Sequence, residues 1–272
     1  MAAEKKPFAI KVIVWALKQI IYNRALRVEG LDLQIDASSN FHALSGNLKS
    51  LNLKFRTLAL EPLQITGGAS MKVTGIDLKV IKILQHKLEA FKRPFRVEGT
   101  YVFTNNDFIA SSAVRNIVQA ILTATFSRLN LGAVKVTRVG IKGNRIIIDG
   151  QSDLLQRFSC SADLGLSNNG HVISLKSIKY GTQDGDFLFQ HPWKVKAVLP
   201  NDMVSCDMGD HTRIDHLTIQ NGLLKVSGFF VVSPRAPLIV TDIVKRGMIH
   251  YDVGEKISAI VAQVLEDALK LW

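Results

Sequence analysis

The chain has 272 residues, 47% of them hydrophobic and 21% charged, a composition that excludes global disorder and supports a folded core. Its 34 lysines and arginines outnumber its 23 aspartates and glutamates, and the formal net charge of +11 favours an anionic partner. Two cysteines exclude a disulfide framework and a zinc site with four thiolates. Lysines interrupt the apolar segment 7–26, which therefore does not predict a membrane-spanning helix. No small-residue cleavage site follows a clean apolar block, so a secretory signal is not predicted either, and whether a targeting peptide has been removed stays open.

The first expected element is a helix over residues 8–24. Apolar residues cover most of its circumference and leave a narrow polar stripe at Lys11, Lys18 and Gln19. A helix packed on one side needs only one apolar stripe. This helix is therefore either enclosed by sheet, or one of its sides meets lipid or a partner.

Alternating apolar and polar residues then predict a run of strands, at Leu31 to Ile35, Leu51 to Phe55 and Met71 to Val80. The phase of the alternation changes across Gly75, which indicates a bulge that bends the strand. Residues 81–91 have helical spacing again, with lysines on the other faces.

A further helix is expected from an N-cap at Asn106-Asp107 to about Arg128. Arg115 is the only charged residue between 108 and 127, so this helix is mostly buried or faces an apolar ligand.

The second half of the chain returns to strands and closes with an amphipathic helix over 255–272. Tight hairpins need residues with positive φ, and three pairs supply them: Gly143-Asn144, Asn169-Gly170 and Asn221-Gly222. Each half combines apolar helices with strands, and no linker separates the halves. We therefore predict one domain over residues 1–272, of the α+β class.

Motifs of enzymes are missing from the sequence: there is no P-loop, dinucleotide fingerprint, nucleophile elbow or His-Glu-x-x-His. One polar cluster lacks a recognised metal-ligand spacing and fits a solvated turn better; it consists of Asp202, Asp207, Asp210, His211, Asp215 and His216. Cys206 lies within it but has no identified catalytic partner. We expect no enzyme, no cofactor and no metal, and metal binding in segment 202–216 stays open.

The segment 108–148 contains no acidic residue. Its six basic residues are the predicted membrane or headgroup contacts: Arg115, Arg128, Lys135, Arg138, Lys142 and Arg145. Nucleic-acid binding would favour interleaved aromatic side chains for stacking, and Phe126 is the only aromatic residue after Phe108 in this segment. The pattern therefore favours an anionic membrane over nucleic acid, with a merely solvated basic face as the alternative.

Several short motifs follow one another between about residues 26 and 234. They are Val28-Glu29-Gly30-Leu31, Leu44-Ser45-Gly46-Asn47-Leu48, Leu58-Ala59-Leu60, Arg93-Pro94-Phe95, Thr104-Asn105-Asn106-Asp107-Phe108, Ile214-Asp215-His216-Leu217-Thr218-Ile219, Asn221-Gly222-Leu223 and Gly228. In this order the chain resembles the LmeA-like phospholipid-binding proteins, particularly the cyanobacterial and plastid type. The resemblance implies a tubular (TULIP-like) lipid-binding protein, with a long curved antiparallel sheet wrapped around apolar helices. It also implies a plastid location at the stromal or thylakoid surface, or a cyanobacterial membrane-associated one.

Together these observations predict a peripheral membrane protein that holds phospholipid or glycolipid acyl chains in an apolar cavity, for lipid transfer or membrane maintenance. The expected cavity walls come from the helix at 107–128 and, as an opposing wall or lid, from the N-terminal helix: Val114, Ile117, Val118, Ile121, Leu122, Phe126, Ile10, Ile13, Val14 and Leu17. The alternative is a protein-interaction or assembly subunit that uses the same helices against a partner, without lipid. The identity of the lipid and the oligomeric state stay open.

Overall fold

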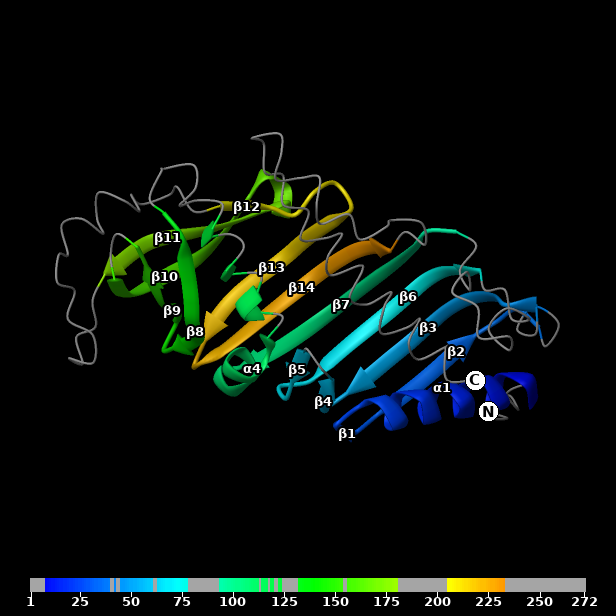
Figure 1. Ribbon diagram of the computed structural model, residues 1–272. Helices are drawn as coiled ribbons and strands as arrows, with labels where there is room; N and C mark the ends of the chain where they lie inside the picture. The colour runs from blue at the N-terminus through cyan, green and yellow to red at the C-terminus, as the bar shows by residue number, and fades with distance from the viewer. Residues whose placement is uncertain are drawn as a thin grey trace.

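Three antiparallel sheets make up most of the described structure (Figure 1). The computed structural model describes residues 8–39, 42, 45–60, 63–77, 93–112, 114–116, 118–119, 122–123, 132–153, 156–180 and 205–232. The first helix, α1 (Phe8–Arg24), has the predicted bounds. The helices predicted at 81–91 and 255–272 lie outside the described residues.

The largest sheet has six strands in the order β13-β14-β7-β6-β3-β2. Their bounds are β2 (Asp32–Asp36), β3 (Asn47–Phe55), β6 (Ala69–Asp77), β7 (Phe95–Thr104), β13 (Thr212–Gln220) and β14 (Leu223–Val232). One face is apolar and the other is polar, as in β2, where Leu33 and Ile35 are buried and the residues between and beside them are exposed. A two-faced antiparallel sheet of this kind packs one side on the core and solvates the other.

The bend expected at Gly75 is present in β6. Gly75 has a φ of +74°, and no Cβ contact would oppose a side chain there, so the constraint is conformational. Val73 and Ile76, three residues apart, both contribute to the core cluster under α1. A regular strand would place them on opposite faces, and the bend at Gly75 restores the apolar side.

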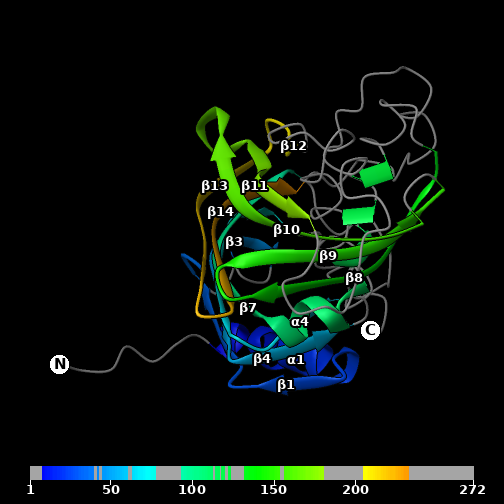
Figure 2. The ribbon, with the colours of Figure 1, turned by 90° about the vertical axis from the view of Figure 1, so that its left-hand side faces the viewer.

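The second sheet has five strands in the order β12-β11-β10-β9-β8. Their bounds are β8 (Val134–Lys142), β9 (Arg145–Ser152), β10 (Gln156–Ser167), β11 (Val172–Tyr180) and β12 (Ser205–Asp207). A third, small sheet lies in the order β1-β4-β5, from β1 (Arg27–Glu29), β4 (Thr57–Leu60) and β5 (Leu63–Ile65). Figure 2 shows the five-stranded sheet facing the viewer, with the small sheet and α1 beneath it.

The main core is formed where the two large sheets pack against each other. Phe158, Ile148 and Val139 of the five-stranded sheet are almost fully buried, and Leu224 of β14 belongs to the same cluster. Phe103, Leu217 and Val226, also from the six-stranded sheet, pack against that cluster. Packing of one sheet on the other therefore buries most of the apolar face of the five-stranded sheet.

The predicted fold class, α+β with a sheet wrapped around apolar helices, is wrong for the described residues. These residues are mainly strand, with few apolar helices for a sheet to wrap around. The five-stranded sheet packs against β7, β13 and β14, with helical Leu122 in the same cluster, whereas α1 covers part of β2, β3 and β6. Helix α1 lies along one end of the six-stranded sheet with its outer side exposed, and α4 (Asn105–Ala110) is a short connection (Figure 1). The alternation of apolar and polar residues indicates which side of each strand is buried. It does not indicate what covers that side, and the prediction that apolar helices do so is the part that is wrong.

The three predicted turn pairs all lie at hairpin turns. The turn between β13 and β14 has positive φ at both Asn221 and Gly222, as a two-residue hairpin of type I′ requires. This turn contacts the β8–β9 turn, because the Gly222 N–H donates to the Gly143 carbonyl at 3.0 Å. The pair Asn169-Gly170 lies in the short 3-10 helix η1 (Asn168–Gly170) between β10 and β11.

The N-cap of α4 lies two residues before the predicted N-cap at Asn106-Asp107. Thr104 is the N-cap, and Asp107 occupies the third helical position of a capping box. The Asp107 side chain is fully buried and accepts hydrogen bonds from the Thr104 N–H at 2.7 Å, the Thr66 N–H at 2.9 Å and the Thr66 hydroxyl at 2.8 Å. One carboxylate thus joins the end of β7, the start of α4 and the loop after β5.

We predict that Asp107→Ala lowers the free energy of unfolding by about 3 kcal/mol, because it leaves buried donors without an acceptor. Denaturant-induced unfolding of the variant and of wild type measures this difference. Asn106→Ala is the matched control, since Asn106 is the exposed neighbour in the same helix, and its stability should stay close to that of wild type. Equal stability of both variants would show that the Asp107 hydrogen bonds contribute nothing net.

Candidate membrane-binding site

The helical residues that follow α4 pack against the main core. Leu122 is 1% exposed within the core cluster, and Val114 and Val118 are half-buried against it. Gln119 fixes this segment to β8, since its side chain donates to the Val134 carbonyl and accepts from the Val136 N–H, both at 2.6 Å. Three of the predicted cavity residues therefore serve as packing. The side chains of Ile117, Ile121 and Phe126 lie outside the described residues.

The other predicted cavity residues, on α1, belong to a different part of the core. Ile10 is buried in a cluster with residues of β2, β3 and β6, and Ile13, Val14 and Leu17 pack against that cluster. The helix after α4 contributes to the cluster between the two large sheets. Within the described part of the chain, the two helices do not face each other across one cavity.

The outer side of α1 exposes large aromatic and aliphatic side chains. Trp15 is 57% exposed and Tyr22 49%, and Leu26, just beyond the helix, is 77% exposed. Trp15 and Tyr22 are seven residues apart, so they lie on the same face, which Lys11 and Lys18 share by helical spacing. The helix contains no acidic residue. An aromatic and basic stripe of this kind suits the interface between lipid headgroups and acyl chains.

Sequence reasoning had taken the outer side of α1 as a narrow polar stripe and did not single out Trp15 and Tyr22. The available signal was their seven-residue spacing in phase with Lys11 and Lys18. The apolar residues at the intervening positions concealed it, because they cover most of the circumference of the helix.

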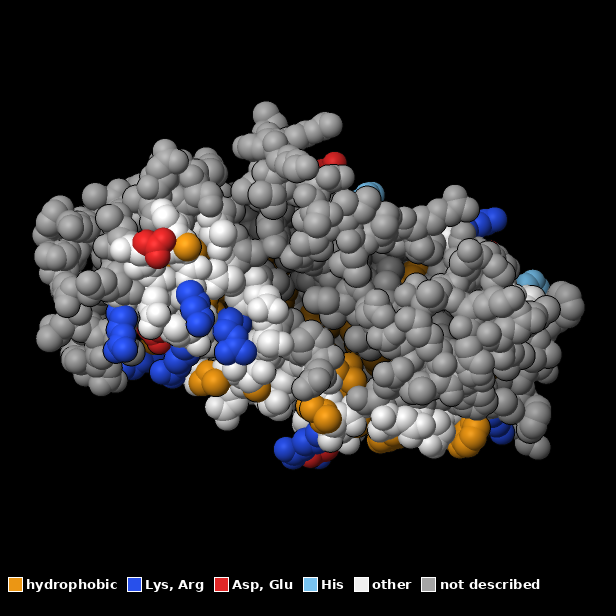
Figure 3. All heavy atoms as spheres, in the orientation of Figure 1, with side chains coloured by type: hydrophobic (Ala, Val, Ile, Leu, Met, Phe, Trp, Pro, Cys, Tyr) orange, Lys and Arg blue, Asp and Glu red, His pale blue; other side chains and the backbone are white. Residues whose placement is uncertain are grey.

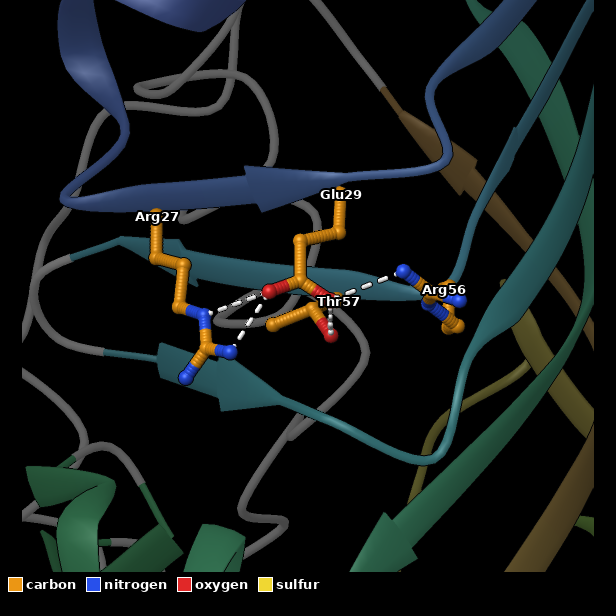
Figure 4. Close-up of polar contacts among 4 residues, drawn as sticks. All are labelled: Arg27, Glu29, Arg56 and Thr57. Carbon is orange, nitrogen blue, oxygen red and sulfur yellow. Dashed lines mark hydrogen bonds and ion pairs between the residues drawn. The ribbon is translucent and has the colours of Figure 1, made fainter.

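A polar cluster on the small sheet follows α1 (Figure 4). The Glu29 carboxylate accepts from the Arg27 Nε at 2.9 Å, from an Arg56 terminal nitrogen at 3.2 Å and from the Thr57 hydroxyl at 3.3 Å. The hydrogen bond from Arg27 is the main cause that holds the pKa of Glu29 below its ordinary value of 4.5. Two arginines thus share one carboxylate at the end of the exposed stripe, which keeps this region basic.

The outer face of the five-stranded sheet is strongly basic. Val134, Val136, Ile148 and Cys160 point into the core, so the residues that alternate with them point outward. The outward strand residues carry seven basic side chains against two acidic ones, and the basic set is Lys135, Arg138, Lys142, Arg145, Arg157, Lys176 and Lys179. Figure 3 shows lysine and arginine side chains gathered over this sheet. We call this set the basic face.

The predicted headgroup residues are distributed unevenly. Lys135, Arg138 and Lys142 are exposed on the basic face. Arg145 is half-buried and ties three strands together, because its guanidinium donates to the carbonyls of Ser161 and Ser177 and lies 3.8 Å from the Asp163 carboxylate. Arg115 is half-buried in the helix after α4, and Arg128 lies outside the described residues. Sequence reasoning missed Arg157, Lys176 and Lys179, because these residues of β10 and β11 come from beyond the acid-free segment and join the same face only through the sheet.

The two carboxylates of the basic face weaken its field only locally. Asp149 is buried and lies opposite Arg138 in the strand register, while Asp163 lies opposite Lys176 and near Arg145. Each is thus next to a basic residue, and Lys135 and Lys179 have no acidic residue opposite them in the register. The net potential of the face is positive.

Cys160, Asp207 and Asp215 have structural surroundings. Burial, with a smaller contribution from Asp149, raises the pKa of the Cys160 thiol to about 12. The Asp207 carboxylate accepts from the Gly209 N–H at 2.9 Å in the turn before β13, and Asp215 forms an ion pair with Arg213. In the described ranges, no three His, Cys, Asp or Glu side chains are grouped as a metal site.

No helix in the part of the chain that the structure describes is long and apolar enough to cross a membrane. Comparisons of the chain with protein-family models, with curated proteins and with solved structures find no match. The resemblance to LmeA-like proteins therefore stays a prediction, and the function is argued from the two surfaces alone.

We predict that the pKa of Glu29, measured by NMR titration, lies below 4.5 in the wild-type protein and rises toward that value in Arg27→Gln. Because the folded-state pKa is depressed, the contribution of Glu29 to stability is present above its ordinary pKa and is lost as the pH falls through the folded-state pKa. Lys49→Gln, on an exposed residue of β3, is the control and should leave the titration of Glu29 unchanged. An unaltered titration in Arg27→Gln would contradict the assigned cause.

Proposed function

We propose that the protein is a peripheral membrane protein that binds anionic phospholipid surfaces, with α1 lying in the plane of the interface. The observation that carries the proposal is the exposure of Trp15 and Tyr22 along one side of α1, beside lysines and without an acidic residue in the helix, with exposed Leu26 just beyond it. Trp and Tyr have an apolar ring and a polar tip, so both are favoured where one end is apolar and the other hydrated. Lysines beside them extend their ammonium groups toward lipid phosphates.

The inner side of α1 supports this role because it fixes the helix to the protein. Ile10 is buried, and Ile13, Val14 and Leu17 pack against the sheet, so the exposed side cannot turn inward without losing these contacts. A rigidly held interfacial helix loses little conformational entropy on binding, which favours affinity.

The basic face adds an electrostatic contribution. Its surplus of positive charge attracts anionic lipid at distances up to about 8 Å, the screening length at physiological ionic strength. Basic residues near an anionic membrane contribute roughly 1 kcal/mol each. We assign the basic face to recruitment and the stripe of α1 to attachment.

The proposal has a finer part, which is that the protein holds the acyl chains of a phospholipid or glycolipid in an apolar cavity. It rests on the sequence resemblance and on the predicted helix residues whose side chains lie outside the described ranges. A location at the plastid stromal or thylakoid surface has the same basis. Analysis of the organic extract of the purified protein by mass spectrometry tests the first, and fractionation of the full-length precursor tests the second.

We predict that the double variant Trp15→Ala, Tyr22→Ala loses roughly 3 kcal/mol of membrane binding, on the order of a hundredfold in Kd, because two large side chains no longer enter the interface. Flotation with vesicles of phosphatidylcholine and phosphatidylglycerol measures the loss. Asn23→Ala, on the same helix, is the control and should bind like wild type. Retained vesicle binding by the double variant would contradict the role of α1. If the wild-type protein binds a copurifying protein and not the vesicles, the assembly alternative is favoured.

We predict that Lys135→Gln combined with Lys179→Gln weakens binding to the same vesicles by about 2 kcal/mol, roughly thirtyfold at low salt. Both lysines are exposed and have no acidic residue opposite them in the strand register, so the fold should be unaffected. Added salt should reduce the difference between wild type and variant, because exposed charges are screened. Gln151→Ala, an uncharged change on the same face, is the control. Salt-independent binding would show that the basic face is only solvated.

A further inference from the structure

A polar groove crosses the six-stranded sheet on the face opposite to its core. The strand residues that line it alternate with the core residues Leu33, Val73 and Val97, so the groove lies on the other side of the sheet from α1. All six strands contribute to it, and its volume is about 600 Å³. This volume falls within the range of ~300–1,000 Å³ that is typical of sites for small molecules.

The charges in the groove are balanced. Three basic and three acidic side chains line it, namely Lys54, Lys72, Arg96, Asp32, Glu98 and Asp215. The Arg96 guanidinium lies 2.7 Å from the Glu98 carboxylate, and the Asp32 carboxylate accepts from the Gln34 amide at 2.9 Å. Neither sign of charge dominates, in contrast to the basic face, so the groove gives no net attraction to an anion or a cation.

A stacked aromatic group fixes the polar side chains at one end of the groove. The Arg96 guanidinium lies 3.6 Å from the centre of the Phe229 ring, and the Arg213 guanidinium lies 5.5 Å from it. Each arginine also forms an ion pair two residues along its own strand, to Glu98 and to Asp215. These contacts from β7, β14 and β13 hold planar polar groups in place before a ligand binds, which reduces the entropy lost on binding.

Other classes of ligand fit the groove poorly. Acyl chains would desolvate its charged side chains without hydrogen bonds in return. The described residues hold no group of three side chains suited to a metal ion. A peptide strand would add to a sheet edge, whereas the groove is on a face. A polyol fits, because its hydroxyl groups both donate and accept, and carboxylates, amides and guanidinium groups supply both partners side by side.

We propose that this groove binds a neutral oligosaccharide of two or three hexose units. The observation that carries the proposal is a preorganised groove of balanced charge, with paired carboxylate and guanidinium groups beside Asn52, Gln34 and the aromatic ring of Phe229. The sugar is either the headgroup of a neutral glycolipid or a free oligosaccharide, since the two share the same hydroxyl chemistry. The proposal does not depend on the membrane role of α1, because the two sites lie on opposite faces of the sheet.

Titration of the full-length, isotope-labelled protein with maltotriose, mannotriose and digalactosyl glycerol tests the proposal by NMR. We expect at least one of these sugars to cause saturable shifts in the backbone amides of β2, β3, β6 and β7. The titration extends to about 10 mM, which nearly saturates a site with a millimolar Kd. Absence of shifts for all three sugars, or shifts confined to residues outside the six strands that line the groove, overturns the proposal.

Two variants and a matched control identify the groove as the site. Asn52→Ala and Glu98→Gln should each raise the Kd for the sugar roughly tenfold, because each removes hydrogen-bond partners of the hydroxyl groups. Asn47→Ala changes the same residue type in the same strand outside the groove and should leave the Kd unchanged. Wild-type affinity in both groove variants, with unaltered unfolding curves, overturns the assignment.

Vesicles separate the two sources of the sugar. Binding to phosphatidylcholine vesicles that contain digalactosyl diacylglycerol, inhibited by the free sugar, identifies a glycolipid headgroup. Binding of the free sugar alone identifies a soluble oligosaccharide, and both results support the shared chemistry. Vesicles of phosphatidylcholine and phosphatidylglycerol without sugar report on α1 and the basic face only, so failure of either proposal is recognised separately.

Discussion

The buried carboxylate of Asp107 is the interaction on which the arrangement of the molecule most depends. It lies where β7 ends, where α4 begins and where the chain leaves β5, and it accepts hydrogen bonds from two of these segments through backbone N–H groups. An unpaired carboxylate would be costly in such a place, so the segments are stabilised only together. Ser111 extends the contact, because its hydroxyl accepts from the Gln64 N–H at 2.9 Å. The small sheet is thereby fixed beside the junction of the two large ones.

The same junction connects the two large sheets. The side-chain oxygen of Asn105, the first residue of α4, accepts from the Ile141 N–H of β8 at 2.8 Å. Gly140 makes this approach possible, since a Cβ there would lie 2.9 Å from that oxygen. With the sheets held in this way, the apolar face of the five-stranded sheet shares a core cluster with β7, β13 and β14, and the outer faces of the two sheets remain separate. One outer face is basic and the other is balanced in charge, so a single fold presents surfaces with different binding chemistry.

Local features of this fold could be predicted from the sequence because they depend on neighbouring residues. The bounds of α1, the bend at Gly75 and the turn at Asn221-Gly222 all follow from spacing or from the need for positive φ. The partner of each apolar face could not be predicted, because periodicity shows which side of an element is buried and not what covers it. The packing of sheet on sheet was missed for this reason.

The candidate surfaces were predictable only in part, for the same physical reason. Lys135 and Arg138 stand in an acid-free segment and could be found by reading along the chain. Arg157 and Lys179 reach the same face only through the register of β9, β10 and β11, which the sequence does not specify. The groove combines residues from six strands and has no local signature.

The position of β14 has a consequence for how the protein folds. β14 pairs with β7 along its whole length, although Leu223 and its partner Thr104 are about 120 residues apart in the chain. The hairpins β8–β9, β9–β10 and β10–β11 need only local contacts and can form while β7 still has an open edge. Closing a loop of this length precedes any gain from the pairing, so completion of the six-stranded sheet is expected to be a late and slow step. Until then, β7 presents unpaired backbone groups, and nascent or truncated chains that end before β14 are exposed to association through that edge.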